Sequence, residues 1–206
     1  VVVLLSGCSK KDDTSTKADF SFENKMKVTA TTGMIADMAA EIGKDRVDVY
    51  AMMGPGVDPH LYKAKAQDLE RLNKADLILY NGLHLESKLG DILEKLAKTK
   101  SITAVAETIS EDALIEVEEG AHDPHVWFDV PLWQEVALTI KNSLIKIDPN
   151  GEDYYTRNFN EYLEKMKNLE AYVQEKLKSL DAEKRILITA HDAFGYFGKA
   201  YGFEVR

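Results

Sequence analysis

Residues 56–62 read Gly56-Val57-Asp58-Pro59-His60-Leu61-Tyr62, and a shorter form of this stretch recurs as Asp123-Pro124-His125-Val126-Trp127. A third histidine, His191, follows the apolar run of residues 186–190. Long stretches of chain separate the three histidines, so only the tertiary fold can bring them together. Imidazole nitrogen suits zinc and its neighbours in the first transition row. We therefore predict that His60, His125 and His191 meet at one metal ion.

The acidic composition argues against nucleic acid as a partner. The chain has 206 residues, of which 45% are hydrophobic and 30% charged, with a net charge of −9. This is the composition of a globular protein with one large or two small lobes. An acidic chain does not favour binding to a phosphate backbone, so we expect no nucleic-acid partner. Solubility alone explains the charge.

The first residues resemble the end of a bacterial lipoprotein signal. Cys8 is the single cysteine, which excludes an internal disulfide and a cysteine-based zinc site. It ends the order Leu5-Ser6-Gly7-Cys8 after an apolar run, and this order resembles a lipobox. We expect residues 1–8 to be a signal remnant, Cys8 to carry a lipid, and polar residues 9–25 to form a flexible tether. The alternative is an apolar strand that ends in a buried cysteine.

Apolar runs of strand length alternate with helical patterns from Met26 onward. The strand-like runs cover residues 26–32, 47–53, 75–80 and 101–106. This alternation predicts an α/β fold with right-handed βαβ units and a parallel sheet, which we assign to a first lobe over residues 26–150. Ligands of such sheets collect beyond the carboxyl ends of the strands. His60, His84 and His191 each follow a strand-like run.

One helical pattern is longer than a single lobe needs. Aromatic and aliphatic residues step by threes and fours from Tyr155 to Leu180, without Gly or Pro. We predict a linking helix over residues 151–180, on the order of 40 Å long, between two lobes. The alternative is a helix of a coiled coil. Residues 181–206 then begin a second βα lobe. Because a lobe of usual size needs on the order of 100 more residues, we expect this lobe to be incomplete in the sequence.

Several polar residues are candidates for supporting the three histidines. Asp58 and Asp123 can turn the two loops, or accept the second ring N–H of the neighbouring histidine. His84 and Glu86 follow the strand at 75–80 and are candidates for lining the cleft or contacting the ligands. His122 follows the acidic stretch of residues 116–120, and we expect it to be a solvated residue of an exposed loop.

With these motifs in place, the chain resembles the cluster A-I substrate-binding lipoproteins of ABC transporters for zinc and manganese. The resemblance rests on four stretches in family order: Gly56-Val57-Asp58-Pro59-His60, Ala75-Asp76-Leu77-Ile78-Leu79-Tyr80-Asn81-Gly82, Asp123-Pro124-His125-Val126-Trp127 and Ala190-His191-Asp192-Ala193-Phe194-Gly195-Tyr196-Phe197. It implies two βα lobes joined by one long helix, with the metal between them. It assigns His60 and His125 to the first lobe and His191 to the second. The family's fourth ligand is a carboxylate late in the second lobe, for which this sequence offers no residue.

The resemblance implies a binding protein, not an enzyme, that captures one Zn²⁺ or Mn²⁺ ion and delivers it to a membrane permease. We expect a monomer, lipid-anchored on the extracytoplasmic face of a bacterial membrane. Three nitrogens and one oxygen favour zinc by the usual affinity order, with manganese close behind. Two alternatives are a surface adhesin with a structural metal and a zinc-dependent hydrolase. The hydrolase needs a base, for which Asp192 or Glu86 can be nominated.

Overall fold

The computed structural model describes residues 19–206. Cys8, the lipobox and most of the expected tether lie outside the described residues. Phe20 does not fit that tether, because its side chain is only 6% exposed and packs in the main core. The prediction that the flexible stretch reaches residue 25 is therefore wrong at Phe20, where burial of an aromatic ring outweighs the polar composition around it.

A four-stranded parallel sheet forms the centre of the first lobe, as the sequence predicts. Its strands are arranged in the order β2-β1-β3-β4, so β1 and β3 lie inside. Their bounds are β1 (Met26–Ala30), β2 (Val47–Ala51), β3 (Leu77–Tyr80) and β4 (Ile102–Ala104).

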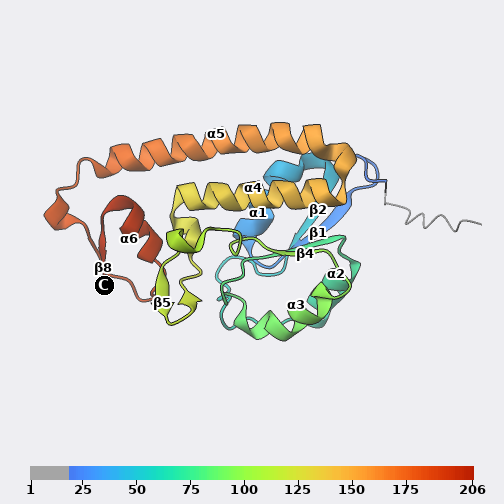
Figure 1. Cartoon of the computed structure of the whole chain (residues 1–206), viewed down its shortest axis with the longest axis horizontal. Coiled ribbons are helices and arrows are strands. Elements are labelled where there is room, and N and C mark those ends of the chain that lie inside the picture. The colour runs from blue at the N-terminus through green and yellow to red at the C-terminus, as the bar shows by residue number, and fades with distance from the viewer. Residues whose placement is uncertain (1–18) are drawn as a thin grey trace, which may run out of the picture.

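Helices cover both faces of this sheet (Figure 1). On one side lie α1 (Gly33–Gly43), α4 (Val130–Ile147) and α5 (Glu152–Leu177), and on the other α2 (Ala66–Lys74) and α3 (Gly90–Ala97). Strand β3 shows the consequence: Leu77 and Leu79 pack in the core with α1, α4 and α5, whereas Ile78 packs in the core on the other face. A strand buried on both faces must be apolar throughout, which explains its unbroken apolar run.

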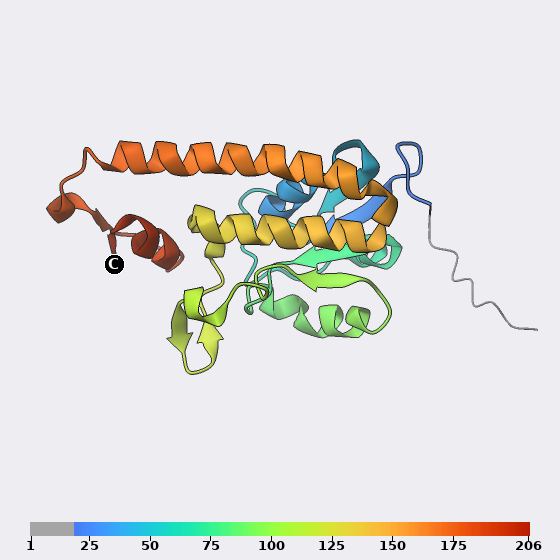
Figure 2. The same ribbon diagram turned by 45° about the horizontal axis from the view of Figure 1, so that its top comes forward.

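The long helix α5 extends beyond the sheet to a second group of elements (Figures 1 and 2). Its 26 residues correspond to a length of about 39 Å. Beyond it lie β7 (Ile186–Leu187), α6 (Gly195–Tyr201) and β8 (Glu204–Val205), with β7 and β8 paired in parallel. The hydroxyl of Tyr201 on α6 donates to Glu170 Oε2 on α5 at 2.5 Å, which ties this group to the helix.

The acidic stretch before Asp123 is not the loop that we expected. It forms an antiparallel hairpin of β5 (Glu116–Glu118) and β6 (Ala121–His122), with Gly120 in the left-handed conformation at its turn. His122 pairs with Glu116 across the hairpin and is partly buried, so the prediction of a solvated loop residue is wrong. The strands are very short, and their charged residues mask the alternation that marks a strand.

Short 3₁₀ helices join the other elements. They are η1 (Lys44–Arg46), η2 (Ser87–Leu89), η3 (Glu111–Ala113), η4 (Val126–Phe128), η5 (Pro149–Gly151) and η6 (Ala182–Lys184).

A buried ion pair fixes the junction between α4 and α5. Two guanidinium nitrogens of Arg46 donate to Asp148 Oδ2 at 2.7 and 3.0 Å, and the hydroxyl of Tyr155 donates to the same oxygen at 2.7 Å. The Arg46 guanidinium also donates to the Phe20 carbonyl at 2.7 Å. One side chain therefore holds the start of the described chain, the end of α4 and the start of α5 together.

We expect Arg46→Ala to lower the free energy of unfolding by about 3 to 5 kcal/mol, because it leaves a buried carboxylate unpaired. Urea unfolding followed by circular dichroism measures this loss. Lys165→Ala is the control, because it removes a solvent-exposed pair with Glu41 and should barely move the unfolding midpoint. Equal effects of the two variants would show that the buried pair has no special weight.

Candidate metal centre

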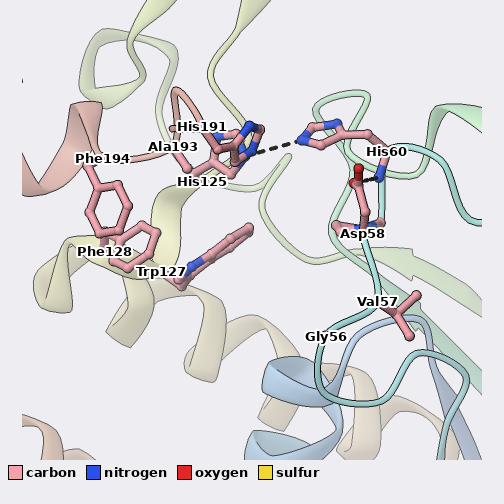
Figure 3. A pocket seen from close by; sticks show the side chains of 11 residues that line it. Gly56, Val57, Asp58, His60, His125, Trp127, Phe128, His191, Ala193 and Phe194 are labelled. Carbon is pink, nitrogen blue, oxygen red and sulfur yellow. Dashed lines mark hydrogen bonds between the residues drawn. The ribbon is translucent and has the colours of Figure 1, made fainter. Parts of the chain in front are cut away.

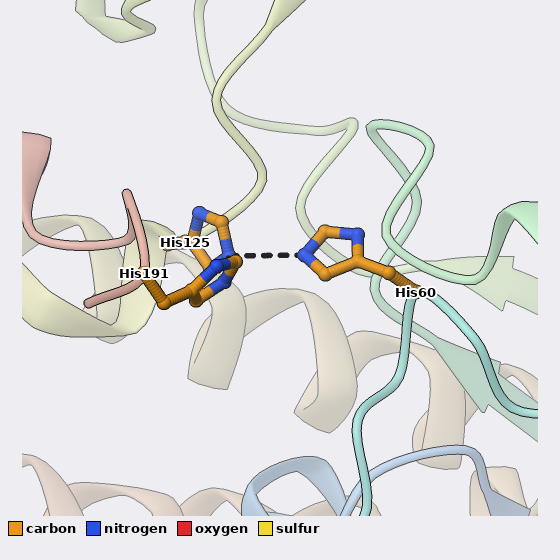
Figure 4. Close-up of side chains that lie close together, drawn as sticks. All are labelled: His60, His125 and His191. Carbon is orange, nitrogen blue, oxygen red and sulfur yellow. Dashed lines mark hydrogen bonds between the residues drawn. The ribbon is translucent and has the colours of Figure 1, made fainter.

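Three imidazoles converge beyond the carboxyl end of the sheet (Figure 4). The Nε2 atoms of His60 and His191 each lie 3.3 Å from Nε2 of His125. One ligand nitrogen from each of the three rings lies within 4.8 Å of the other two. The convergence expected from the sequence is therefore present, while the role of the rings as metal ligands stays a prediction.

Three loops carry these rings. His60 lies in the loop that leaves β2, His125 immediately precedes η4, and His191 follows β7. Only His60 follows a strand of the four-stranded sheet; His125 lies after the β5–β6 hairpin and His191 after the separate β7–β8 pair, so packing between these units brings the rings together. The three segments line one cleft of about 460 Å³ together with Trp127 and Phe128 (Figure 3). The Trp127 ring packs edge-on against His125, with centroids 5.2 Å apart.

Asp123 orients the ring of His125. One oxygen, Oδ1, lies 2.6 Å from Nδ1 of His125 and also accepts the backbone N–H of His125 at 2.9 Å. A carboxylate only accepts hydrogen bonds, so Nδ1 carries the proton and Nε2 presents its lone pair to the cleft. Both residues are buried. Of the two roles that the sequence left open for Asp123, the structure gives it both.

Asp58 has only one of these roles. Its Oδ1 accepts the backbone N–H of His60 at 2.9 Å, which closes the turn around Pro59 (Figure 3). The His60 ring makes no hydrogen bond to this carboxylate, so Asp58 shapes the loop and leaves the ring orientation to packing. The pKa of His60 lies below the ordinary value of 6.5, chiefly because the ring is withdrawn from water and secondly because it faces His125.

His191 is the most exposed of the three rings, and its segment is held through α6. The hydroxyl of Tyr196 donates to the Asp123 carbonyl at 2.9 Å and accepts the Ile115 N–H at 3.1 Å. The rings of Phe194 and Phe128 pack with centroids 4.3 Å apart. These contacts join the segment of His191 directly to the loop of His125.

The other two candidates from the sequence do not join this cluster. His84 is exposed and, with Glu86, lines a separate pocket. Glu86 is 3% exposed and its carboxylate bonds to Thr31 and to backbone N–H groups, so it does not contact the three rings. The expectation that His84 and Glu86 contact the ligands is wrong, because the turn after β3 directs both side chains elsewhere.

Sequence reasoning missed two groups of supporting residues. Tyr196 and Trp127 both lie in the quoted motifs, but the sequence alone assigns neither of them a role. Their roles depend on contacts between segments far apart in the chain, for which a single sequence gives no signal. Asn81 stands in a quoted motif without a role and Ser87 in none, although both donate hydrogen bonds to backbone carbonyls of the histidine loops.

The spacing of the nitrogens suits a small tetrahedral ion. Two nitrogens bound at 2.0–2.1 Å in tetrahedral directions lie about 3.3–3.4 Å apart, which agrees with the two separations of 3.3 Å. Within residues 19–206, these three histidines are the one group of histidine, cysteine and carboxylate side chains close enough to hold an ion.

Comparison with known proteins adds the family. The chain matches the sequence profile of the family described as zinc-uptake complex component A, periplasmic, over residues 28–206. The zinc-binding protein TroA of Treponema pallidum (strain Nichols) is 48% identical over 188 residues, covering 91% of this chain and 61% of that protein. The manganese-binding lipoprotein MntA of Bacillus subtilis (strain 168) is 43% identical over 203 residues, covering 98% of this chain and 65% of that protein.

The solved structure of the periplasmic zinc-binding protein TroA from Treponema pallidum has the same fold. Its TM-score is 0.86 at 49% identity, covering 88% of this chain and 66% of that one. The manganese ABC transporter substrate-binding lipoprotein PsaA of Streptococcus anginosus is 35% identical over 208 residues, covering 98% of this chain and 66% of that protein. The chain belongs to the zinc-uptake complex component A family. It spans less than two thirds of the length of TroA and MntA.

We expect Asp123→Ala to abolish the preference of His125 for the tautomer that is protonated at Nδ1. In the unmodified chain, the ¹⁵N chemical shifts of His125 should show a protonated Nδ1. In the variant, the two shifts should approach those of a mixture of the Nδ1–H and Nε2–H tautomers. Asp58→Ala is the matched control, because Asp58 bonds only to a backbone N–H. A His125 spectrum that is unchanged in Asp123→Ala would contradict the assigned hydrogen bond.

The pKa of His60 gives a second test. Proton NMR titration without metal should place it below 6.5, so the ring stays neutral to a lower pH than a free histidine. In His125→Ala the pKa should rise toward 6.5, because the ring gains access to water and loses a neighbouring ring that repels a positive charge. A fall in the variant would mean that His125 stabilises the protonated form.

Proposed function

We propose that this chain is the metal-capturing part of an extracytoplasmic binding protein for an ABC importer, with Zn²⁺ as its cargo. The observation that carries the proposal is that Nε2 of His60 and Nε2 of His191 each lie 3.3 Å from Nε2 of His125, the separation expected for two nitrogens on a tetrahedral ion. The ligands in this proposal are His60, His125 and His191. The hydrogen bond from His125 to Asp123 supports it, since metal-binding histidines usually donate their other ring N–H in this way.

Zinc is the cargo that three imidazoles favour. Nitrogen donors bind Zn²⁺ more tightly than Mn²⁺ in the usual affinity order, whereas Mn²⁺ prefers oxygen ligands. Relatives named for zinc and for manganese both lie close to this chain in sequence. Manganese is therefore the second candidate, and competition between the two ions is the informative experiment.

The proposal extends to partners and place. The bound ion would pass to a membrane permease, and the protein would act as a monomer on the outer side of the cytoplasmic membrane. Lipid attachment at Cys8 would keep it there, a proposal that rests on the lipobox and on relatives named as lipoproteins. None of the helices within residues 19–206 is long and apolar enough to cross a membrane.

Family membership favours transport over the two alternatives. A hydrolase needs a base beside the metal-bound water. Of the two carboxylates nominated for this role, Glu86 is buried in its own hydrogen bonds away from the cleft, and Asp192 is exposed and does not line the cleft. The metal-binding function is also compatible with adhesion, the second alternative.

We expect elemental analysis after dialysis to find about one zinc ion per chain, and calorimetry to show zinc binding tighter than manganese by more than about tenfold. His191→Ala should weaken zinc binding by at least about tenfold, because it removes one of three nitrogen donors.

His84→Asn is the matched control, since His84 is an exposed histidine outside the cluster and asparagine tolerates the left-handed φ of 61° at this position. It should bind zinc like the unmodified chain. Zinc content near zero in the unmodified chain would contradict the proposal. Tighter binding of manganese than of zinc would show that manganese is the cargo.

A further inference from the structure

The turn of residues 81–87 contacts both loops that carry the first two histidines. The hydroxyl of Ser87 donates to the carbonyl of His60 at 3.2 Å. At the other end of the turn, Asn81 Nδ2 donates to the carbonyl of Pro124 at 3.1 Å, one residue before His125. Both contacts reach backbone atoms, so they act on the position of each loop and not on the chemistry of a ring.

A buried carboxylate holds this turn in shape. Glu86 Oε1 accepts the hydroxyl of Thr31 at 2.6 Å and the N–H of Asn81 at 2.8 Å, and Oε2 accepts the N–H of Gly82 at 3.3 Å. Among the ion pairs of the described residues, none includes Glu86. A carboxylate without a cation is retained in a protein interior only when such donors satisfy it. Glu86 therefore pins the turn to the end of β1.

The backbone of the turn is strained. Gly82, Leu83 and His84 have φ angles of 81°, 51° and 61°, three successive residues in the left-handed region. Glycine adopts this conformation freely, whereas Leu83 and His84 do so only when their surroundings require it. The contacts of the turn with its surroundings therefore hold Leu83 and His84 in a conformation that they would not adopt alone.

The side chain of Asn81 is used for its donors. Its Nδ2 faces the carbonyls of Gly82 and Pro124, while its buried Oδ1 has no hydrogen-bond partner within the described residues. A buried acceptor without a partner is unfavourable. Of the two carbonyls that Nδ2 contacts, that of Pro124 belongs to the loop of His125, so this hydrogen bond is the one that connects the turn to the loop.

We propose that the 81–87 turn is a clamp that sets the separation of His60 and His125, with Asn81 and Ser87 as positioning residues and Glu86 as the support beneath them. This inference rests on the metal-capturing function proposed above. It predicts that removing either donor weakens zinc binding although neither side chain touches the ion.

The test is zinc affinity in Ser87→Ala and Asn81→Ala, measured by competition with a chelator. We expect each to bind zinc about 3- to 10-fold more weakly, the usual weight of one hydrogen bond. Two variants away from the site are matched controls. Ser143→Ala removes a hydroxyl that donates to the Thr139 carbonyl at 2.9 Å, and Asn158→Ala removes an amide that donates to the Ile42 carbonyl at 3.0 Å. Both controls should keep the affinity of the unmodified chain.

A double variant separates positioning from loss of stability. Ser87 acts through His60, so Ser87→Ala should cause no further loss of affinity in a His60→Ala background. Ser87→Thr keeps the hydroxyl and should restore binding. The visible absorption of bound Co²⁺ should also change in Ser87→Ala and Asn81→Ala, and stay constant in the two controls, because it reports ligand geometry in the folded protein.

The outcomes are distinct. If the unmodified chain binds no zinc, the proposed function fails. If it binds zinc and the turn variants match it, the clamp is wrong although the function stands. If the controls lose as much affinity as the turn variants, or if Ser87→Ala weakens binding further without His60, the turn acts only on general stability and the clamp is again wrong.

Discussion

Asp123 connects the two sides of the candidate metal centre. Asp123 Oδ1 accepts hydrogen bonds from the ring and from the backbone N–H of His125. The backbone carbonyl of Asp123 accepts a hydrogen bond from the hydroxyl of Tyr196 on α6, the helix that follows His191. A side chain added at Gly195 would lie 2.9 Å from Asp123 Oδ2, so α6 approaches this carboxylate closely. The relative position of His125 and His191 therefore depends on contacts that converge on one residue, and the long helix alone does not set it.

A second fixed point lies at the far end of the first lobe. Arg46, Asp148 and Tyr155 join the end of α4 to the start of α5 in a buried network. A helix of 26 residues is stiff over its length, so its direction is set where it begins. Two constraints therefore position the segment of His191. One is its own contact with the Asp123 loop, and the other is the direction of α5, which leads the chain to it. Small errors in either would move the ring by more than a metal site tolerates.

The sequence predicted what depends on local pattern. The parallel sheet followed from alternating apolar runs, and the long helix from a regular stripe without Gly or Pro. The meeting of three histidines followed from the repeated Asp-Pro-His motif and a third histidine after an apolar run. It did not predict the β5–β6 hairpin or the burial of Phe20, since neither has a periodic signal. It also misjudged Glu86, because the same placement after a strand suits a ligand support and a turn support equally. Only contacts between distant segments distinguish the two.

The three rings are held to different degrees, and this bears on how the site selects an ion. His125 is buried with its ring bonded to Asp123, His60 is fixed through its backbone, and His191 is exposed on a short loop. A rigid cage selects by size, as sites for hard cations do. A site with one adjustable ligand conforms to the geometry that the ion prefers, so the chemical type of the donor atoms decides which ion binds most tightly. Three imidazoles then favour a metal of intermediate softness such as zinc, whatever the exact shape of the cleft.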